Sequence, residues 1–279
     1  MAKILDGKLV AEAIIQDCAQ RVSEKISRGE LSPKLSVVCV GDDDSNNSYL
    51  KGIEKKAADA GILFEVHQLS EDASKDDLIS KIQDLNEDDT VNGILLMRPL
   101  PASLRSFESE ICEYIATEKD VDAAKKLSVA GAYLGIPAYG ACTAESCMEI
   151  LHYFDIDIEG KHAVVIGRSL VVGKPVGNLL LNKNATVTIC HSKTKNIEKL
   201  SKQADIVIVA TRTPKKFGKK YFSEGQVVID AGINFDECTG KLCGDVDFDA
   251  VSDKVAAITP VPGGVGSVTS AILIKHLLH

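Results

Sequence analysis

The chain has 279 residues, of which 45% are hydrophobic and 26% charged, and its formal net charge is −8 at pH 7. This length predicts two domains, and the negative charge argues against nucleic acid or an anionic membrane as the main partner. No run of about 18 apolar residues occurs and the N-terminus has no signal-peptide pattern, so we expect a cytoplasmic protein without a membrane span.

The first half of the chain alternates amphipathic and buried segments. Apolar residues at helical spacing predict helices over 8–28, 46–60 and 74–88. Short apolar runs predict strands over 34–41, 63–69 and 91–97. This β-α-β-α-β order predicts a parallel, doubly wound α/β sheet.

The second half repeats the pattern after an irregular passage. Residues 123–142 are rich in Ala and Gly, and we interpret them as the passage between domains, followed by a helix over 144–153. Four further strands are predicted, at 162–167, 185–190, 205–210 and 226–232. The C-terminal helix is expected to pack back on the first domain. The predicted domains are therefore 1–140 with 265–279, and 141–264.

The cysteines give no pattern of a metal site or a disulfide framework. They are scattered without a CxxC pair, which favours reduced thiols and no bound metal. The eight are Cys18, Cys39, Cys112, Cys142, Cys147, Cys190, Cys238 and Cys243.

The segment VVIGRSLVVGKPVGNLLL (164–181) predicts a dinucleotide-binding turn. Gly167 ends a strand and Gly173 begins a helix, whose free N–H groups could bind a phosphate. The spacing is not GxGxxG, so a purely structural turn is an equal alternative for the segment by itself. Arg168 and Ser169 lie in the turn, and Ser192 follows the next strand, where an NAD enzyme would carry an acidic residue. This combination favours NADP, although Arg168 could also be a solvated surface charge.

Six segments together resemble one family nearly from end to end. They are VNGILLMRPLP (91–101), EKDVDA (118–123), GRSLVVGKP (167–175), CHSKT (190–194), VVIDAGIN (227–234) and TPVPGGVGSVTSAIL (259–273). These resemble the bifunctional methylenetetrahydrofolate dehydrogenase/cyclohydrolase family of the FolD type. The PVPGGVG part disfavours a shikimate-type dehydrogenase that shares only a Rossmann-like domain.

The resemblance implies two α/β domains, the second Rossmann-like and binding NADP, with an active-site cleft between them and a homodimeric assembly. It also implies oxidation of 5,10-methylenetetrahydrofolate to the 5,10-methenyl form, followed by hydrolysis to 10-formyltetrahydrofolate. Tyr49 would orient the folate, and Asp122 would accept two N–H bonds from the pterin edge; a cap or a solvated loop acid is the alternative for Asp122. The remaining matched positions are Pro262, Gly263 and Gly264 for the substrate, and Gly167, Arg168, Ser169, Gly173, Ser192 and Ile233 for the cofactor.

Two positions depart from the family pattern. Family members usually read Tyr-x-x-x-Lys, but Tyr49 is followed at that spacing by Ile53. The usual DGILVQLPLP is here NGILLMRPLP, so Met97 stands at the glutamine position. That lysine and glutamine are the pair which the resemblance assigns to the cyclohydrolase step.

The residues Ile53 and Met97 are expected to affect the hydrolysis step and not the hydride transfer. Hydride transfer depends mainly on positioning, whereas hydrolysis needs a proton acceptor. We therefore predict a dehydrogenase with weak or absent cyclohydrolase activity. A fully bifunctional enzyme, an NAD-dependent one and a non-catalytic folate- or nucleotide-binding relative are the alternatives. Lys56 shares the helix face of Tyr49 and Ile53 and is a substitute base, although solvated helix surface is the favoured interpretation for it.

Overall fold

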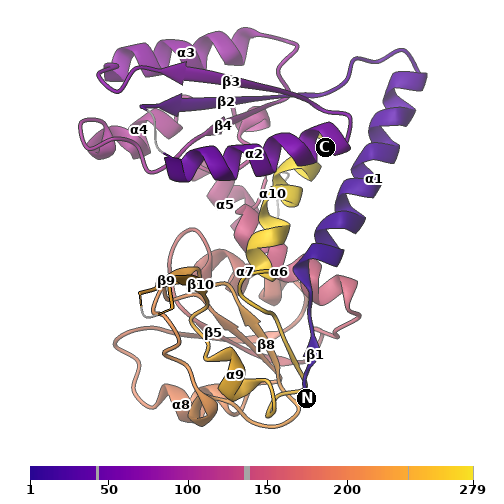
Figure 1. Cartoon of the computed structure of the whole chain (residues 1–279), viewed down its shortest axis with the longest axis vertical. Helices are drawn as coiled ribbons and strands as arrows, with labels where there is room; N and C mark the ends of the chain where they lie inside the picture. The colour runs from indigo at the N-terminus through magenta and orange to yellow at the C-terminus, as the bar shows by residue number, and fades with distance from the viewer. Residues whose placement is uncertain (42–43, 135–138, 238, 279) are drawn as a thin grey trace. The chain divides into compact units, whose positions relative to one another are not determined.

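The computed structural model describes residues 1–41, 44–134, 139–237 and 239–278 (Figure 1). The chain forms two compact units: Met1–Ala11 with Ala141–Thr269, called the six-stranded unit, and Glu12–Gly140 with Ser270–His279, called the three-stranded unit. The predicted boundaries differ from these units at both ends, because residues 1–11 and 265–269 pack in the six-stranded unit.

The three-stranded unit contains a parallel sheet in the order β3-β2-β4. Its strands are β2 (Lys34–Val40), β3 (Leu63–Leu69) and β4 (Gly93–Leu96). Its principal helices are α2 (Asp44–Asp59), α3 (Lys75–Glu87) and, from Glu12 onward, α1 (Gly7–Ser27). The predicted alternation of helices and strands is thus present. Helix α2 begins two residues before the predicted helix at 46–60 and directly follows residues 42–43, which lie outside the described residues.

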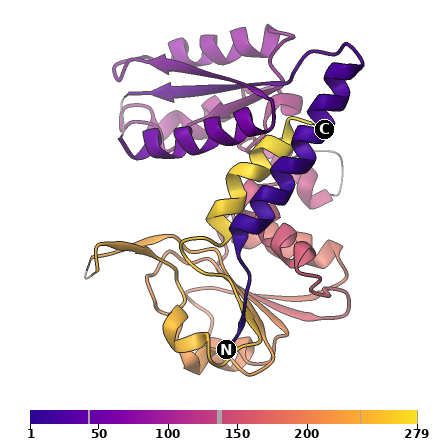
Figure 2. The ribbon, with the colours of Figure 1, turned by 45° about the vertical axis from the view of Figure 1, so that its right-hand side comes forward.

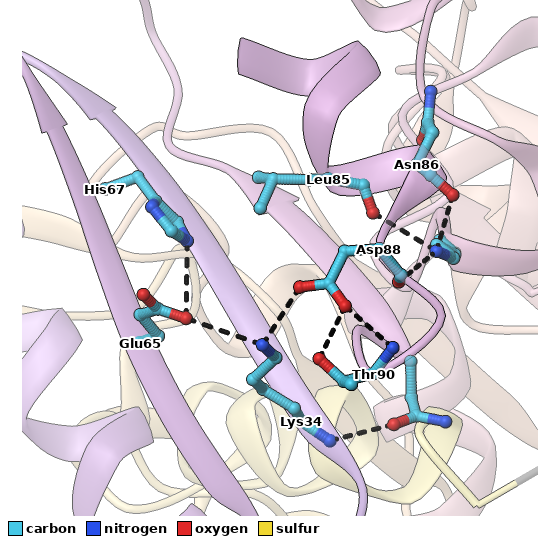
Figure 3. A network of polar contacts seen from close by, with 9 residues as sticks. Lys34, Glu65, His67, Leu85, Asn86, Asp88 and Thr90 are labelled. Carbon is cyan, nitrogen blue, oxygen red and sulfur yellow. Dashed lines mark hydrogen bonds and ion pairs between the residues drawn. The ribbon is translucent and has the colours of Figure 1, made fainter.

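Helix α3 shows how local sequence places an element in this unit. Ser74 caps it in a capping box with Asp77. Its apolar stripe, which includes Leu78 and Ile82, packs on Val38 of the central strand. Beyond its C-terminal end, Asp88 accepts a hydrogen bond of 3.2 Å from Nζ of Lys34, whose Nζ also lies 3.7 Å from Glu65 (Figure 3). The helix is thus tied to both β2 and β3 across one face of the sheet.

The passage over 123–142 differs from its prediction as irregular chain. Residues Lys126–Leu134 form helix α5, whereas residues 135–138 lie outside the described residues. The carboxylate of Asp120 accepts hydrogen bonds from the N–H groups of Ala124 and Lys125 and from the hydroxyl of Ser128, each within 2.9 Å. Asp120 therefore satisfies donors at the start of α5 from outside the helix. Helical periodicity within the segment does not reveal such a cap.

The six-stranded unit contains a parallel sheet in the order β1-β11-β8-β7-β5-β6. The four predicted strands are present as β5 (His162–Ile166), β6 (Thr186–Cys190), β7 (Ile206–Val209) and β8 (Val227–Asp230). The sheet is extended by β1 (Lys3–Ile4) and β11 (Ala257–Ile258), and an antiparallel hairpin pairs β9 (Asn234–Asp236) with β10 (Lys241–Cys243). The helices are α6 (Cys142–Tyr153), α7 (Gly173–Asn182), α8 (Ile197–Ser201) and α9 (Phe248–Val251).

The C-terminal helix α10 (Val265–His276) begins in the six-stranded unit and ends in the three-stranded unit. In the latter, Nδ1 of His276 lies 2.7 Å from the carbonyl oxygen of Val121. Arg21 of α1 donates a hydrogen bond of 2.6 Å to the carbonyl of Leu278, and the two helices lie next to each other there (Figure 2). The chain end thus becomes part of the core of the three-stranded unit.

The described cysteines are all buried, and Cys238 lies outside the described residues. Burial raises the pKa of the Cys18 thiol to about 11 and that of Cys147 to about 12. Within the described ranges, no three His, Cys, Asp or Glu residues gather to form a metal site. No described helix combines the length and the apolar character needed to cross a membrane.

Candidate functional site

The predicted dinucleotide turn connects β5 to α7 through two glycines in tight contact. Gly167 has φ of +136°, and a Cβ atom there would lie 2.2 Å from the carbonyl oxygen of Ala210. A Cβ atom at Gly173 would lie 2.3 Å from the carbonyl oxygen of Gly167. Ser169 Oγ accepts hydrogen bonds from the N–H groups of Val172 and Gly173 at 3.1 and 3.4 Å. Only glycine fits at the two positions, so the turn is shaped by close backbone packing.

The turn lies at the topological switch point of the six-stranded sheet. Strand β6 lies on one side of β5 and β7 on the other, so the chain reverses its direction of sheet building at β5. Ligands of open parallel sheets bind outside the carboxyl ends of the strands at such a point. The side chain of Arg168 is exposed there, as is that of Ser192 after β6, and Ile233 after β8 is 56% exposed. The structure therefore places the predicted cofactor residues along one edge of one sheet.

A buried carboxylate shapes the loop after β7 and was not singled out by the sequence analysis. Asp245 is fully buried. The groups that donate to its carboxylate are the N–H groups of Thr211, Arg212 and Thr213, the Thr211 hydroxyl and the Asn234 side-chain amide. A Cβ atom at Gly232 would lie 2.3 Å from the Asp245 carboxyl carbon. Its only sequence signal is an acidic residue within the apolar segment LCGDVDF.

A second buried carboxylate lies beside it at the end of β8. Asp230 is 3% exposed and accepts hydrogen bonds from the N–H groups of Gly232, Asp245 and Val246 at 2.9, 3.2 and 2.8 Å. Burial raises the pKa of Asp230 to about 7, although the backbone donors oppose this shift. Its proton is therefore lost near neutral pH.

The raised pKa of Asp230 predicts a pH dependence of stability. The folded-state pKa of about 7 exceeds the ordinary value of 3.8, so between these values the native state binds more protons than the unfolded state. The free energy of unfolding should therefore fall as pH rises from about 4 to 7, by up to about 1.4 kcal/mol per pH unit. Urea unfolding across this range would measure the slope. Asp230→Asn should flatten it, and an unchanged slope would contradict the prediction.

The predicted substrate loop at 262–264 packs on the start of α1 within the six-stranded unit. The N–H of Gly7 donates a hydrogen bond of 2.8 Å to the Gly263 carbonyl, and Gly263 has φ of +102°. A Cβ atom at Gly7 would lie 2.1 Å from the Gly264 carbonyl oxygen. Pro262, which follows a cis peptide bond, is exposed. The glycines therefore serve backbone packing of this loop, and close approach to a ligand stays a prediction.

Helix α2 carries the predicted active-site tyrosine and the first departure from the family pattern. Tyr49 is 41% exposed, whereas Ile53 is fully buried on the helix face that also includes Ala57. Lys56 is half-buried, in contrast to the exposed Lys55. Burial and the nearby charge of Lys55 lower the pKa of Lys56. The structure therefore differs from the favoured interpretation of Lys56 as simple solvated surface.

The second departure, Met97, lies directly after β4 and is 7% exposed. Its N–H donates a hydrogen bond of 2.9 Å to the Val38 carbonyl on β2. Neither Met97 nor the buried Ile53 has a side-chain group that accepts a proton at neutral pH.

Asp122 forms an ion pair with Arg98, a residue that the sequence analysis did not single out. Nη2 of Arg98 lies 2.6 Å from Oδ2 of Asp122, and the side chains are 26% and 29% exposed. Burial lowers the pKa of Arg98, but the charge of Asp122 and the hydrogen bond to it outweigh this effect, so the pKa is raised. The sequence signal that could have identified Arg98 is the segment MRPLP, in which arginine stands where the family segment has leucine.

Ala123, next to Asp122, has a left-handed backbone that a glycine would adopt more easily. Its φ is +49°, which costs an L-residue about 1–2 kcal/mol, whereas glycine loses about 0.5–1 kcal/mol more backbone entropy on folding than alanine. We therefore expect Ala123→Gly to raise the free energy of unfolding by about 0.5–1 kcal/mol. Urea unfolding would measure it, with Ala124→Gly as a control that should destabilise. A loss of stability in Ala123→Gly would contradict the expectation.

Two models of one family match the chain. The model of the tetrahydrofolate dehydrogenase/cyclohydrolase catalytic domain matches residues 5–122, and that of the NAD(P)-binding domain matches residues 141–279. The chain belongs to the tetrahydrofolate dehydrogenase/cyclohydrolase family. The predicted family and the predicted α/β fold with a second, Rossmann-like domain are thereby confirmed.

Individual members of the tetrahydrofolate dehydrogenase/cyclohydrolase family match over nearly their full length. The Bifunctional protein FolD of Alkaliphilus metalliredigens is 45% identical over 100% of this chain and 97% of its own, and that of Bacillus mycoides is 47% identical over 100% and 96%. The solved structure of bifunctional FolD from Campylobacter jejuni has a TM-score of 0.94 at 38% identity, covering 100% of this chain and 98% of its own. That of the Trypanosoma brucei enzyme, complexed with NADP and an inhibitor, has a TM-score of 0.91 at 32% identity, covering 99% and 96%. The names of these relatives favour the fully bifunctional alternative over the predicted weak cyclohydrolase.

Proposed function

We propose that this protein is an NADP-dependent 5,10-methylenetetrahydrofolate dehydrogenase. The observation that carries the proposal is the glycine turn between β5 and α7 at the switch point of the six-stranded sheet, in a chain that both family models match. The turn fits a dinucleotide phosphate, because side chains are excluded at Gly167 and Gly173 and a helix N-terminus follows.

The proposed cofactor-binding residues belong to the six-stranded unit, and the proposed folate-binding residues belong to the three-stranded unit. In the six-stranded unit, the start of α7 with Ser169 would hold the pyrophosphate, and Arg168 with Ser192 would bind the 2′-phosphate. In the three-stranded unit, Asp122 would accept the N–H groups of the pterin edge, and Tyr49 would orient the ring. NADP, when bound, supplies the hydride acceptor. The protein's contribution to that step is positioning, which requires no side-chain base.

A coupled measurement of binding and turnover tests this function. Methylenetetrahydrofolate with NADP should give NADPH, and replacing NADP by NAD should lower kcat/KM. Ser192→Ala should reduce the preference for NADP without changing the KM for folate. Binding of folate and NADP without turnover would instead support the non-catalytic alternative, and equal use of both cofactors would contradict the NADP assignment.

The pair of Asp122 and Arg98 predicts a selective effect on the folate substrate. Hydrogen bonds to a charged group are worth about 1.5–3 kcal/mol, so Asp122→Asn should lower kcat/KM for methylenetetrahydrofolate by roughly 10- to 100-fold. The KM for NADP should stay unchanged. Arg98→Leu, the matched control, retains the carboxylate and removes only its ion-pair partner, so the expected loss is under about 10-fold. Equal losses in both variants would contradict a direct role of Asp122.

For the hydrolase step we propose a slow reaction, based on Ile53 and Met97. Both side chains are buried and apolar, whereas the relatives' names favour full bifunctionality. Lys56 is the alternative base, supported by its half-buried position and lowered pKa.

We also propose a homodimer, supported by two exposed apolar side chains on one face of the β9–β10 hairpin. Phe235 and Leu242 are directly paired across the strands and are 61% and 51% exposed. Phe235→Ser with Leu242→Ser should lower the molar mass measured by light scattering to that of one chain. A wild-type protein that is monomeric at micromolar concentration would contradict this proposal.

A further inference from the structure

An arginine in the loop after β7 has a backbone conformation that is unusual for its residue type. Arg212 has φ of +55°, in the left-handed region that a non-glycine residue rarely adopts. The conformation is held by Asp245, which accepts hydrogen bonds from the N–H groups of Thr211, Arg212 and Thr213. Asp245 is fully buried. Its hydrogen bonds therefore anchor the loop to the core and determine the position of the Arg212 backbone.

This loop lies against the glycine turn of the dinucleotide site. The N–H of Ala210 donates a hydrogen bond of 2.8 Å to the Ile166 carbonyl, and the Ala210 carbonyl occupies the space where a Gly167 side chain would be. Both segments follow the adjacent strands β5 and β7, at the carboxyl edge where the direction of sheet building reverses. Arg212 therefore lies at the switch point, where a ligand of this type of sheet is expected.

The guanidinium of Arg212 is available for a ligand. The side chain is exposed, and within the described parts of the chain Arg212 forms no salt bridge. Lys215, three residues later, differs in this respect because its Nζ lies 2.7 Å from Asp236. The third cation of this loop, Lys216, has its Nζ 5.8 Å from the centroid of the Phe217 ring. Among the described residues, Arg212 is thus the cation of this loop with neither an ion-pair partner nor an aromatic ring beside it. Its planar fork of donors suits a phosphate better than a lysine would.

We propose that Arg212 binds the pyrophosphate of the dinucleotide from the β7 side of the switch point. The proposal rests on the proposed dinucleotide function and adds a residue that the sequence analysis did not include. Ser192, proposed for the 2′-phosphate, follows β6 on the opposite side of β5. Arg212 is thereby directed to the part of the ligand that is remote from the 2′-phosphate. The strained backbone is consistent with a functional position, since such strain persists where surrounding structure enforces it.

Equilibrium binding to Arg212→Ala tests this assignment with three ligands. The Kd values for NADP and NAD should rise by the same factor, roughly 10- to 100-fold, because a charge-assisted contact common to both is lost. The Kd for adenosine 2′-monophosphate, which lacks both the pyrophosphate and the nicotinamide half, should change by less than about threefold. Arg212→Lys should retain part of the affinity, because the charge stays while the fork of donors is lost.

A matched control is Lys202→Ala, which removes an exposed cation just before the amino end of β7, at the opposite edge of the same sheet. Its Kd values should equal those of the wild type. Thermal unfolding of each variant reports whether the loop still folds, and Arg212→Gly supplies a second variant that lacks both the charge and the backbone strain.

The outcomes separate the two proposals. If the wild type binds NADP and the Arg212 variants bind it equally well, the assignment of Arg212 is wrong and the proposed function stands. If the affinity for adenosine 2′-monophosphate falls as much as that for NADP, Arg212 acts on the adenosine half and the pyrophosphate assignment is wrong. If the wild type binds neither NADP nor NAD, the proposed function itself fails.

Discussion

Purified protein is expected to hydrolyse methenyltetrahydrofolate about 10²- to 10⁴-fold more slowly, relative to its dehydrogenase rate, than a family member with lysine and glutamine at positions 53 and 97. This factor is the usual contribution of general acid–base catalysis, and water must lose a proton as it attacks the methenyl carbon. Ile53 is fully buried and Met97 is 7% exposed. Neither has a group that could take this proton, whereas hydride transfer depends on positioning and should be retained.

The measurement follows the two steps separately with methylene- and methenyl-tetrahydrofolate as substrates. Hydrolysis at a rate comparable with dehydrogenation would contradict the expectation and favour the bifunctional assignment carried by the relatives' names. Lys56→Ala then becomes decisive. If Lys56 is a displaced base, this variant loses hydrolysis and keeps dehydrogenation; if Lys56 only covers the helix surface, both rates are unchanged.

A gain-of-function variant also tests whether the residues at positions 53 and 97 cause slow hydrolysis. Ile53→Lys with Met97→Gln restores the residues of the family pattern and should raise hydrolysis relative to dehydrogenation. Because Ile53 is fully buried, a lysine there carries a desolvation cost, and part of the double variant could unfold. The free energy of unfolding is therefore measured alongside the rates. A stable double variant without a gain in hydrolysis would show that the two exchanges do not account for the slow step.

Asp245→Ala is expected to lower the free energy of unfolding by about 3–5 kcal/mol, the range found when one partner of a buried charged network is removed. The carboxylate is the shared acceptor for the loop at 211–213 and for the Asn234 side chain. Without it, several part-buried N–H groups lose their partner together. Urea unfolding, with attention to the slope as well as the midpoint, would measure this loss.

Asp247 offers a matched control two residues away. Its side chain accepts one hydrogen bond, of 3.3 Å, from the N–H of Ala250 as the N-cap of α9. Asp247→Ala should therefore cost only about 1 kcal/mol. Similar losses for Asp245→Ala and Asp247→Ala would contradict the role given to Asp245. Because Asp245 holds the backbone of Arg212, Asp245→Ala should also weaken NADP binding under conditions in which the protein remains folded.

Much of the fold follows from local pattern. Buried parallel strands are continuous apolar runs, so β2, β5, β7 and β8 are visible in the sequence to within one or two residues. The edge strands β3 and β6 are less buried but were also predicted to within one residue. Helix α3 carries its own capping box and apolar stripe. The two glycines of the dinucleotide turn are likewise visible, because a strand, a glycine and a helix start follow one another in the chain.

Other features depend on residues that are distant in sequence. Strands β1 and β11 have two residues each, too few for any periodicity, and they exist because each pairs with a neighbour in the sheet. The N–H groups just before helix α5 donate hydrogen bonds to the carboxylate of Asp120, which lies outside the helix. The partner of Asp122 is identified only when the chain brings Arg98 to within 2.6 Å of it.

The sequence by itself determined the family, the alternation of helices and strands, the glycine turn and the apolar residues at positions 53 and 97, because these are properties of local sequence. Tertiary structure alone decided that Asp245 holds the loop after β7, that Arg98 pairs with Asp122 and that Arg212 lies at the switch point. The physical reason is that a buried carboxylate is defined by the donors that surround it. Those donors come from segments whose proximity is set by sheet order and packing, and neither can be obtained from local pattern.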